Sequence, residues 1–197
     1  MAYLYLIRHP RTQPDPALPA SAWSLDPAGE AEVRALTNLS LWDGISAVYT
    51  SHHPKAARVG EAVHAVHAIP HVVVPGLEEA RRERFLDSVE AFEAMQRAFF
   101  AHPDRPPLPD FESAASALAR FNGALENILA QHPAPDSLAV VSHATVLTLY
   151  VAHLAGRAPD FAQWRSIGFA AIMAIDRATI RPCTGFLTAP YDELPHP

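Results

Sequence analysis

Two histidines stand at the ends of apolar segments that are far apart in the chain. His9 comes after the apolar run 2–7 and is separated from it by Arg8, and His143 is the last residue of the run 137–143. A neutral imidazole is a good nucleophile near pH 7, and a guanidinium can bind two phosphoryl oxygens at once. Two histidines, an arginine and a carboxylate at one edge of a sheet would therefore suit phosphoryl transfer.

The apolar pattern predicts the elements that must position these residues. Apolar β-rich runs predict strands at 2–7, 45–51, 71–75, 137–143, 169–176 and 179–183, and helical spacing predicts helices at 26–39, 54–68, 87–101, 110–131 and after 143. Asp26 and Pro27 suit the start of the first helix, and Gly156 could cap the last. This alternation predicts an α/β fold, a three-layer α/β/α sandwich with a mainly parallel sheet, in which ligands bind beyond the carboxyl ends of the strands.

The bulk composition narrows the class of protein. A chain of 197 residues, 49% of them hydrophobic, suits a single domain over residues 1–197. A net charge of −6 argues against a nucleic-acid surface. Cys183 is the only cysteine, and the first apolar run is too short for a signal peptide or a membrane span. We therefore expect a cytoplasmic protein with no membrane partner, and the sequence leaves its oligomeric state open.

Six motifs in chain order carry a resemblance to a known family. The segment "LIRHPRT" is similar to a strand that ends in Arg-His-Gly, and "SLDPAGEAEVRAL" follows it as a first helix would. "TSHHPKAARVGEAV" is similar to a Ser-x-x-x-(Arg/Lys)-Ala block, "LEEA" to a Leu-x-Glu segment, "FESAASALAR" to a Glu-Ser helix start and "VVSHATVL" to a second-histidine motif. Each motif is weak alone. Together, between residues 3 and 150, they resemble the histidine phosphatase superfamily, which has the phosphoglycerate mutase-like fold.

The resemblance implies a role for each residue of the site. His9 would attack phosphorus and become a phosphohistidine, Arg8 would bind two phosphoryl oxygens, and His143 would be a second donor to them. Glu79 would protonate the leaving alkoxide and later activate water, with the adjacent Glu78 as the alternative. No metal or cofactor is expected, because cationic side chains would neutralise the phosphate.

The second cation of the phosphate site has two candidates. Lys55 aligns with an arginine of the family, and Arg58 lies nearly one helical turn further on. If the helix began elsewhere, Arg58 would face the site and Lys55 would face solvent. Ser51, His52 and Ala144 complete the expected set of substrate-binding residues.

Some residues depart from the family pattern. Pro10 replaces a glycine, which removes a backbone N–H and fixes φ, and Lys55 keeps a charge without the guanidinium fork. The family's asparagine after the first motif and its glycines after Leu-x-Glu are also missing. These losses favour a phosphatase acting on a small phosphorylated substrate. A phosphoglycerate mutase-type phosphotransferase and a non-catalytic phosphate-binding module remain as alternatives.

Residues 80–112 are expected to form a helical cap over the site. Some of their arginines and aromatic residues could recognise the part of the substrate beyond the phosphate. Alternatively, the aromatic residues belong to a helix core and the arginines are solvated. The residues concerned are Arg81, Arg82, Arg84, Phe92, Phe99 and Phe100.

Overall fold

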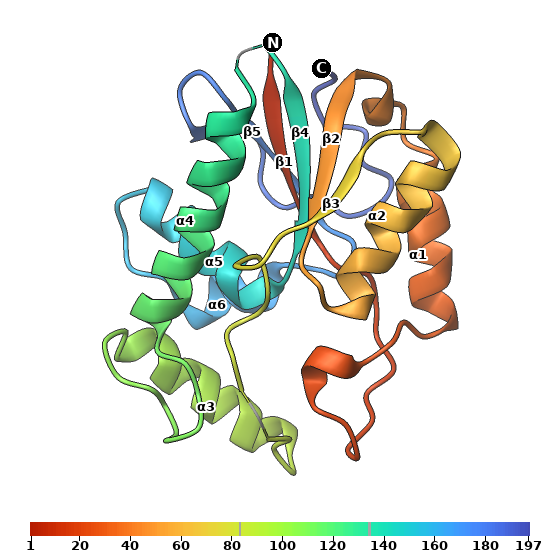
Figure 1. Cartoon of the computed structure of the whole chain (residues 1–197). Helices are drawn as coiled ribbons and strands as arrows, with labels where there is room; N and C mark the ends of the chain where they lie inside the picture. The colour runs from red at the N-terminus through yellow and green to blue at the C-terminus, as the bar shows by residue number, and fades with distance from the viewer. Residues whose placement is uncertain (83, 134) are drawn as a thin grey trace.

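A mixed β-sheet forms the middle of the molecule. The computed structural model describes residues 1–82, 84–133 and 135–197. These residues form a six-stranded sheet in the order β3-β2-β4-β1-β5-β6 (Figure 1). The strands β3, β2, β4 and β1 run parallel to one another, whereas β5 is antiparallel to β1 and β6 is antiparallel to β5. The strands are β1 (Tyr3–Arg8), β2 (Ile45–Thr50), β3 (His71–Val73), β4 (Ser137–Ser142), β5 (Ile172–Asp176) and β6 (Arg181–Pro182).

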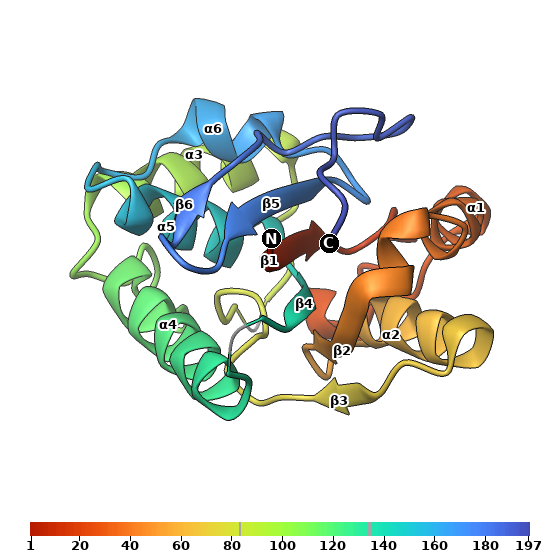
Figure 2. The ribbon, with the colours of Figure 1, turned by 90° about the horizontal axis from the view of Figure 1, so that it is seen from above.

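Helices cover both faces of the sheet. Seen from above, α1 and α2 lie on one side of it and α3 to α6 on the other (Figure 2). Their bounds are α1 Pro27–Thr37, α2 Pro54–His67, α3 Val89–Ala101, α4 Ala114–Gln131, α5 Ala144–Leu154 and α6 Phe161–Ser166, with short 3-10 helices at Ala20–Ala22 and Ser40–Gly44. This arrangement confirms the predicted three-layer α/β/α sandwich. In the part of the chain that is described, no helix combines the length and apolarity needed to cross a bilayer.

The sheet is buried on both faces because its central strands are apolar throughout. In β1, Leu4 and Leu6 pack into the core shared with α3, α4 and α5, while Tyr5 and Ile7 pack into the core shared with α1 and α2. Successive side chains of a strand point to opposite faces, so a continuous apolar run serves two cores. The strand therefore has no solvated face, and its polar residues come only where it ends.

The register of the sheet places the ends of β1 and β4 side by side. Arg8 lies opposite Ser142, and the backbone N–H of His9 donates to the carbonyl oxygen of Ser142 at 2.9 Å. His143 follows Ser142 directly, so the two histidines leave neighbouring strands at the same level. The helix α3 and the segment 10–26 lie beyond these carboxyl ends (Figure 1).

Most of the predicted elements are present, with shifts at their ends. The carboxylate of Asp26 accepts the N–H of Gly29 at 2.7 Å, which confirms the predicted helix start, and Gly156 has a φ of +62° after α5. The strand predicted from 169 begins only at Ile172, because Ala170 turns the chain with a φ of 54°. The short helix α6 was not predicted, because six residues are too few to show a helical period.

Gly29 and Gly123 allow a test of how α1 packs on the loop after His9. A Cβ atom at Gly29 would lie 2.0 Å from the carbonyl oxygen of Arg11, whereas one at Gly123, inside α4, would meet nothing within 4 Å. Alanine favours a helix over glycine by about 0.5–1 kcal/mol, so Gly123→Ala should raise the free energy of unfolding by about that amount. Gly29→Ala should instead lower it by about 1–3 kcal/mol, because backbone must move. Urea unfolding of both variants checks this, and an equal gain in both would contradict the packing.

Candidate active site

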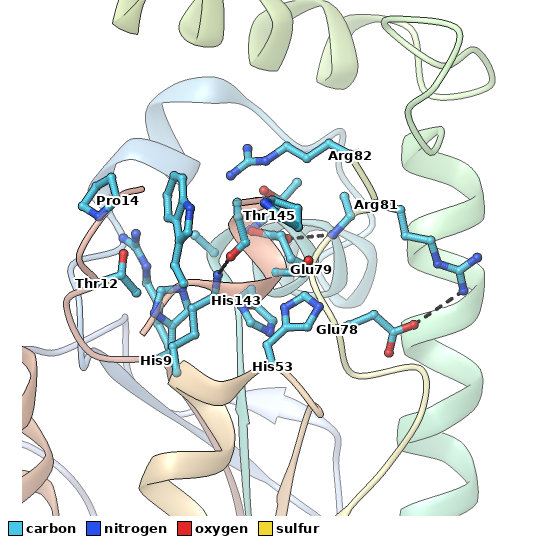
Figure 3. A pocket seen from close by; sticks show the side chains of 18 of the residues that line it. His9, Thr12, Pro14, His53, Glu78, Glu79, Arg81, Arg82, His143 and Thr145 are labelled. Carbon is cyan, nitrogen blue, oxygen red and sulfur yellow. Dashed lines mark hydrogen bonds and ion pairs between the residues drawn. The ribbon is translucent and has the colours of Figure 1, made fainter. Parts of the chain in front are cut away.

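A cavity lies where the parallel strands end. Its volume is about 800 Å³, and the side chains of His9, His143, Lys55 and Glu79 all line it. These residues come from segments that follow β1, β4, β2 and β3 respectively. Figure 3 shows His9 and His143 next to each other, with Glu79 close by. The structure therefore brings together residues that the sequence separates by more than a hundred positions.

The ring of His9 is held with one nitrogen directed at the backbone. Its Nδ1 lies 2.7 Å from the carbonyl oxygen of Pro10. A carbonyl can only accept, so Nδ1 carries the proton and the neutral ring has its lone pair on Nε2. Burial, reinforced by the charges of Lys55 and Arg8, lowers the pKa of His9 well below its ordinary value. His9 is therefore neutral at pH 7, and Pro10 supplies the acceptor although it has no N–H.

His143 faces His9, with 5.0 Å between their ring centroids. Its Nε2 lies 2.7 Å from the hydroxyl of Ser51, while its Nδ1 is buried and has no hydrogen-bond partner among the described residues. Burial, then the neighbouring His9 and Lys55, lowers the pKa of His143 well below its ordinary value. Ser51 is thus placed behind His143 and is not among the residues that line the cavity, in contrast to the expected substrate contact.

Two cations flank the imidazoles, of which Lys55 is buried and Arg8 is partly buried. The guanidinium of Arg8 donates to the carbonyl oxygen of Ile167 and lies 4.0 Å from the ring centroid of Phe169. The ammonium of Lys55, a residue only 5% exposed, donates to the carbonyl oxygen of Ala20. Burial lowers the pKa of Arg8 to about 10 and that of Lys55 to about 8. Both side chains line the cavity, where a bound anion would restore their lost solvation.

Arg58, the alternative to Lys55, lies outside the cavity lining. Its guanidinium is paired with the carboxylate of Glu30, with Nη2 3.0 Å from Oε2 and Nε 3.2 Å from Oε1. The helix α2 begins at Pro54, which turns Lys55 toward the strand ends and Arg58 toward α1. Of the two candidates, the structure places only Lys55 at the site.

Glu78 and Glu79 both line the cavity, but their carboxylates have different partners. Glu79 accepts the backbone N–H groups of Thr145 at 3.1 Å and Val146 at 3.2 Å, at the start of α5. Glu78 forms an ion pair with Arg120, 3.3 Å away. Glu79 therefore sits beside the histidines, at a helix N-terminus that favours negative charge. Glu78 is committed to an ion pair that joins the loop to α4.

His53 reaches the site, although the sequence analysis did not assign it there. It is buried, its ring centroid lies 4.7 Å from that of His143, and its Nδ1 has no hydrogen-bond partner among the described residues. Burial, then the charge of Lys55, lowers the pKa of His53 to about 4. The sequence feature that could have identified His53 is its position between Ser51 and Lys55, which were both assigned to the site. His52 and Ala144 line the cavity as the sequence analysis expected.

Segment 80–112 contributes to the cavity wall and to the core. Arg81, Arg82 and Phe92 line the cavity. These three residues are therefore in a position to contact the substrate. The other residues named for this segment are buried in the core or paired at the surface. These are Phe99 and Phe100 in the core, and Arg84, whose guanidinium lies 3.2 Å from Asp110.

Within residues 1–82, 84–133 and 135–197, no group of three or more His, Cys, Asp or Glu side chains is arranged to hold a metal ion. The charges that face the cavity come mainly from arginine and lysine, opposed by Glu78 and Glu79. Such an arrangement is suited to an anionic ligand.

Known structures share this fold over nearly the whole chain. Bacillus stearothermophilus YhfR superposes with a TM-score of 0.76 and 19% identity, over 95% of this chain and 98% of that one. A mycobacterial glucosyl-3-phosphoglycerate phosphatase bound to inorganic phosphate gives 0.76 and 17%, over 96% and 99%. A putative alpha-ribazole-5'-P phosphatase from Escherichia coli gives 0.71 and 20%, over 96% and 98%. At these identities the likeness shows the fold alone.

The sequence itself identifies the family. The profile of the histidine phosphatase superfamily (branch 1) matches residues 4–182. The chain therefore belongs to that superfamily, as the six motifs suggested. A comparison with curated protein sequences finds no significant match.

The placement of Lys55 and Arg58 predicts that only Lys55 contributes to anion binding. Lys55→Ala should weaken the binding of inorganic phosphate about tenfold or more, because a charge-assisted hydrogen bond is worth about 1.5–3 kcal/mol. Arg58→Ala should leave the Kd within about twofold, because it removes only a surface ion pair. Isothermal titration of both variants at pH 7 measures this. Equal weakening in the two variants would mean that Arg58 also reaches the anion.

Proposed function

We propose that this protein is a phosphatase that hydrolyses a small phosphate monoester through a phosphohistidine on His9, without a metal ion. The observation that carries the proposal is the pair of neutral imidazoles, His9 and His143, with ring centroids 5.0 Å apart in a cavity lined by Arg8 and Lys55. One imidazole has a lone pair available for attack, and the other has an unpartnered nitrogen beside it.

The phosphate is bound by charge and by fixed hydrogen-bond donors. Arg8 and Lys55 supply two positive charges whose pKa values are already lowered by burial in the free protein. If the Ser51 hydroxyl donates to Nε2 of His143, the imidazole proton lies on Nδ1, which then donates to a phosphoryl oxygen. The N–H of Ala144, at the first position of α5, has no carbonyl within its own helix to bond and is a further donor.

In the first chemical step, the lone pair on Nε2 of His9 attacks phosphorus. The proton that enters with the substrate monoanion passes to the Glu79 carboxylate. The phosphorus–oxygen bond to the organic group then breaks, and the leaving oxygen takes this proton from Glu79. The Nδ1–H of His9, bonded to the carbonyl oxygen of Pro10, stabilises the positive charge that develops on the ring. The products of this step are the free alcohol and a phosphohistidine.

In the second step, water attacks the phosphohistidine. The Glu79 carboxylate takes a proton from the water as its oxygen bonds to phosphorus, and the phosphorus–nitrogen bond breaks. The electron pair returns to Nε2 of His9, inorganic phosphate leaves, and Glu79 is again protonated. The protons and electron pairs of both steps come from the substrate, water and the side chains already described, so the sequence of steps calls for no metal ion.

The relatives support a phosphatase in general terms. The superfamily is that of histidine phosphatases, and the similar structures include the glucosyl-3-phosphoglycerate phosphatase above and a phosphoserine phosphatase mutant from Entamoeba histolytica in complex with phosphoserine. The latter has 16% identity and a TM-score of 0.72, over 98% of this chain and 100% of that one. The substrates in these names are those of the relatives and are not assigned to this chain.

Replacing His9 tests the proposed nucleophile. His9→Ala should lower kcat for p-nitrophenyl phosphate by about a thousandfold or more, because no other side chain can form the covalent intermediate. His153→Ala, which removes an exposed histidine near the end of α5, is the control and should retain full activity. Both are assayed in EDTA, which is expected to leave the rates unchanged, with circular dichroism to verify folding.

The outcome of that assay also separates the alternatives. Unchanged turnover in His9→Ala would end the proposal. Phosphate binding by the wild-type protein with no hydrolysis of any ester would instead indicate a non-catalytic module, for which Pro10 and Lys55 are the motivating residues. Transfer of the phosphoryl group to a second hydroxyl rather than to water would indicate a mutase-type phosphotransferase.

The depressed pKa of Lys55 predicts how activity falls at alkaline pH. Because this pKa is about 8 in the free protein, Lys55 loses its charge as the pH rises through that value. Substrate capture should weaken, so kcat/KM should fall above about pH 8, whereas kcat should fall less because the bound dianion holds the proton on Lys55. Lys55→Arg should move the alkaline limb of kcat/KM upward, since guanidinium stays charged. A limb that is unmoved in Lys55→Arg would assign the titration to another group.

A further inference from the structure

The cavity is far larger than a phosphate group requires. Its volume of about 800 Å³ falls within the range of about 300–1,000 Å³ typical of sites for drug-sized organic ligands. The two histidines, Arg8 and Lys55 account for one part of its wall. The rest of the wall faces whatever organic group the phosphate carries, so its chemistry indicates the class of substrate.

One part of that wall is a stack of three aromatic rings with an arginine at each end. The Arg82 guanidinium lies 4.6 Å from the ring centroid of Phe92, which meets Trp164 edge-on at 5.7 Å. Trp164 in turn lies 5.3 Å from Phe161, whose other neighbour is Arg97, at 3.7 Å. Arg82, Phe92 and Trp164 line the cavity, and Phe161 and Arg97 support them from behind. The stack joins α3 to α6, so this wall is fixed before a ligand binds.

A further aromatic residue reaches the cavity from the segment 10–26. The ring centroid of Trp23 lies 5.7 Å from the ammonium of Lys55, so it borders the phosphate site. Its indole N–H donates to the carbonyl oxygen of Asp15 at 3.0 Å, and its ring lies 6.0 Å from that of Phe85. Phe85 is 40% exposed and supports Trp23 from outside the cavity lining. Trp23 and Phe85 thus bring apolar surface from two segments together beside the phosphate site.

Arg82 could in principle bind a second anionic group of the substrate instead. Burial lowers its pKa, and the nearby Glu79 carboxylate opposes that effect, so part of the Arg82 charge is already balanced within the cavity. Its guanidinium lies over Phe92, which leaves a planar cation suited to stacking on a ring. The other arginines of this part of the lining are paired as well, Arg81 with Glu78 at 3.5 Å and Arg11 with Asp26 at 2.9 Å. Balanced charges beside Phe92, Trp164 and Trp23 favour a ring over a second anion.

We propose that the organic group of the substrate is a flat aromatic one, held between Trp23 and the wall formed by Arg82, Phe92 and Trp164. This inference rests on the proposed phosphatase function and names the substrate class for the same site. Aromatic rings bury large apolar areas and gain further from edge and stacking contacts with other rings. Small sugar phosphates and phosphorylated acids would leave these ring surfaces uncovered.

Three synthetic esters of similar leaving-group basicity test the proposal. They are ethyl phosphate, 2-phenylethyl phosphate and 2-carboxyethyl phosphate, so that differences in kcat/KM report the organic group rather than bond strength. The wild-type protein should prefer the phenylethyl ester over the ethyl ester by about tenfold or more, the effect expected from burying one phenyl ring. Phe92→Leu, which keeps apolar volume but removes the ring, and Trp23→Ala should each lower that ratio several-fold.

The control variant is Val72→Ala, which trims an exposed apolar residue on the edge strand β3 and should leave the ratio unchanged. A wild-type ratio near one, or a ratio that Phe92→Leu and Trp23→Ala both leave intact, would overturn the proposal. A preference for the carboxyethyl ester that is lost in Arg82→Met would also overturn it, in favour of an anion site.

Binding of non-hydrolysable analogues separates this inference from the proposed reaction. Phenylphosphonate should bind about tenfold more tightly than methylphosphonate by calorimetry, and Phe92→Leu should remove most of the difference. If that holds while no ester is hydrolysed, the aromatic subsite stands and the phosphatase proposal fails. If esters are hydrolysed and the two phosphonates bind equally, the reaction stands and the subsite is refuted.

Discussion

The parallel pairing of β1 with β4 is the contact on which the site depends. Arg8 lies opposite Ser142 in this pair, so the next residues, His9 and His143, leave the sheet together. A slip of one residue would turn every side chain of a strand to the other face, and both cores would then lose their apolar lining. The packing that stabilises the fold therefore also fixes the distance between the two imidazoles. The relative position of the two imidazoles thus follows from the packing of the sheet.

Burial acts on the ionisable groups of the site in a common direction. It lowers the pKa values of His9, His143, Arg8 and Lys55, because each loses solvation of its charged form. The imidazoles respond by remaining neutral, as a nucleophile must, whereas the two cations remain charged at neutral pH and unsolvated. This loss of solvation is an unfavourable electrostatic contribution, which an anion of the right size relieves. Stability given up at such a site is a common cost of function.

Sequence reasoning succeeded where the signal was local and failed where it depended on packing. Apolar runs and an N-cap at Asp26 were sufficient to predict the strands, the main helices and the three layers. The motifs predicted that His9, His143 and Glu79 would meet, and the structure places them in one cavity. The sequence could not decide between Lys55 and Arg58, because that choice depends on where α2 begins. Nor could it place Ser51 behind His143, or assign His53, since both positions follow from side-chain orientation at the end of β2.

The hydrogen bond from His9 to Pro10 links the proton on the nucleophile to the path of the chain that follows. The backbone N–H of Arg11 donates to the Glu32 carboxylate at 2.7 Å, and α1 approaches this loop so closely at Gly29 that no side chain fits. The helix therefore holds the Pro10 carbonyl in place. Were this loop to swing outward, the imidazole proton could exchange to Nε2, and the ring would lose its reactive lone pair without any change in its position. Tautomerism at His9 is in this sense under the control of a helix on the far side of the sheet from α5.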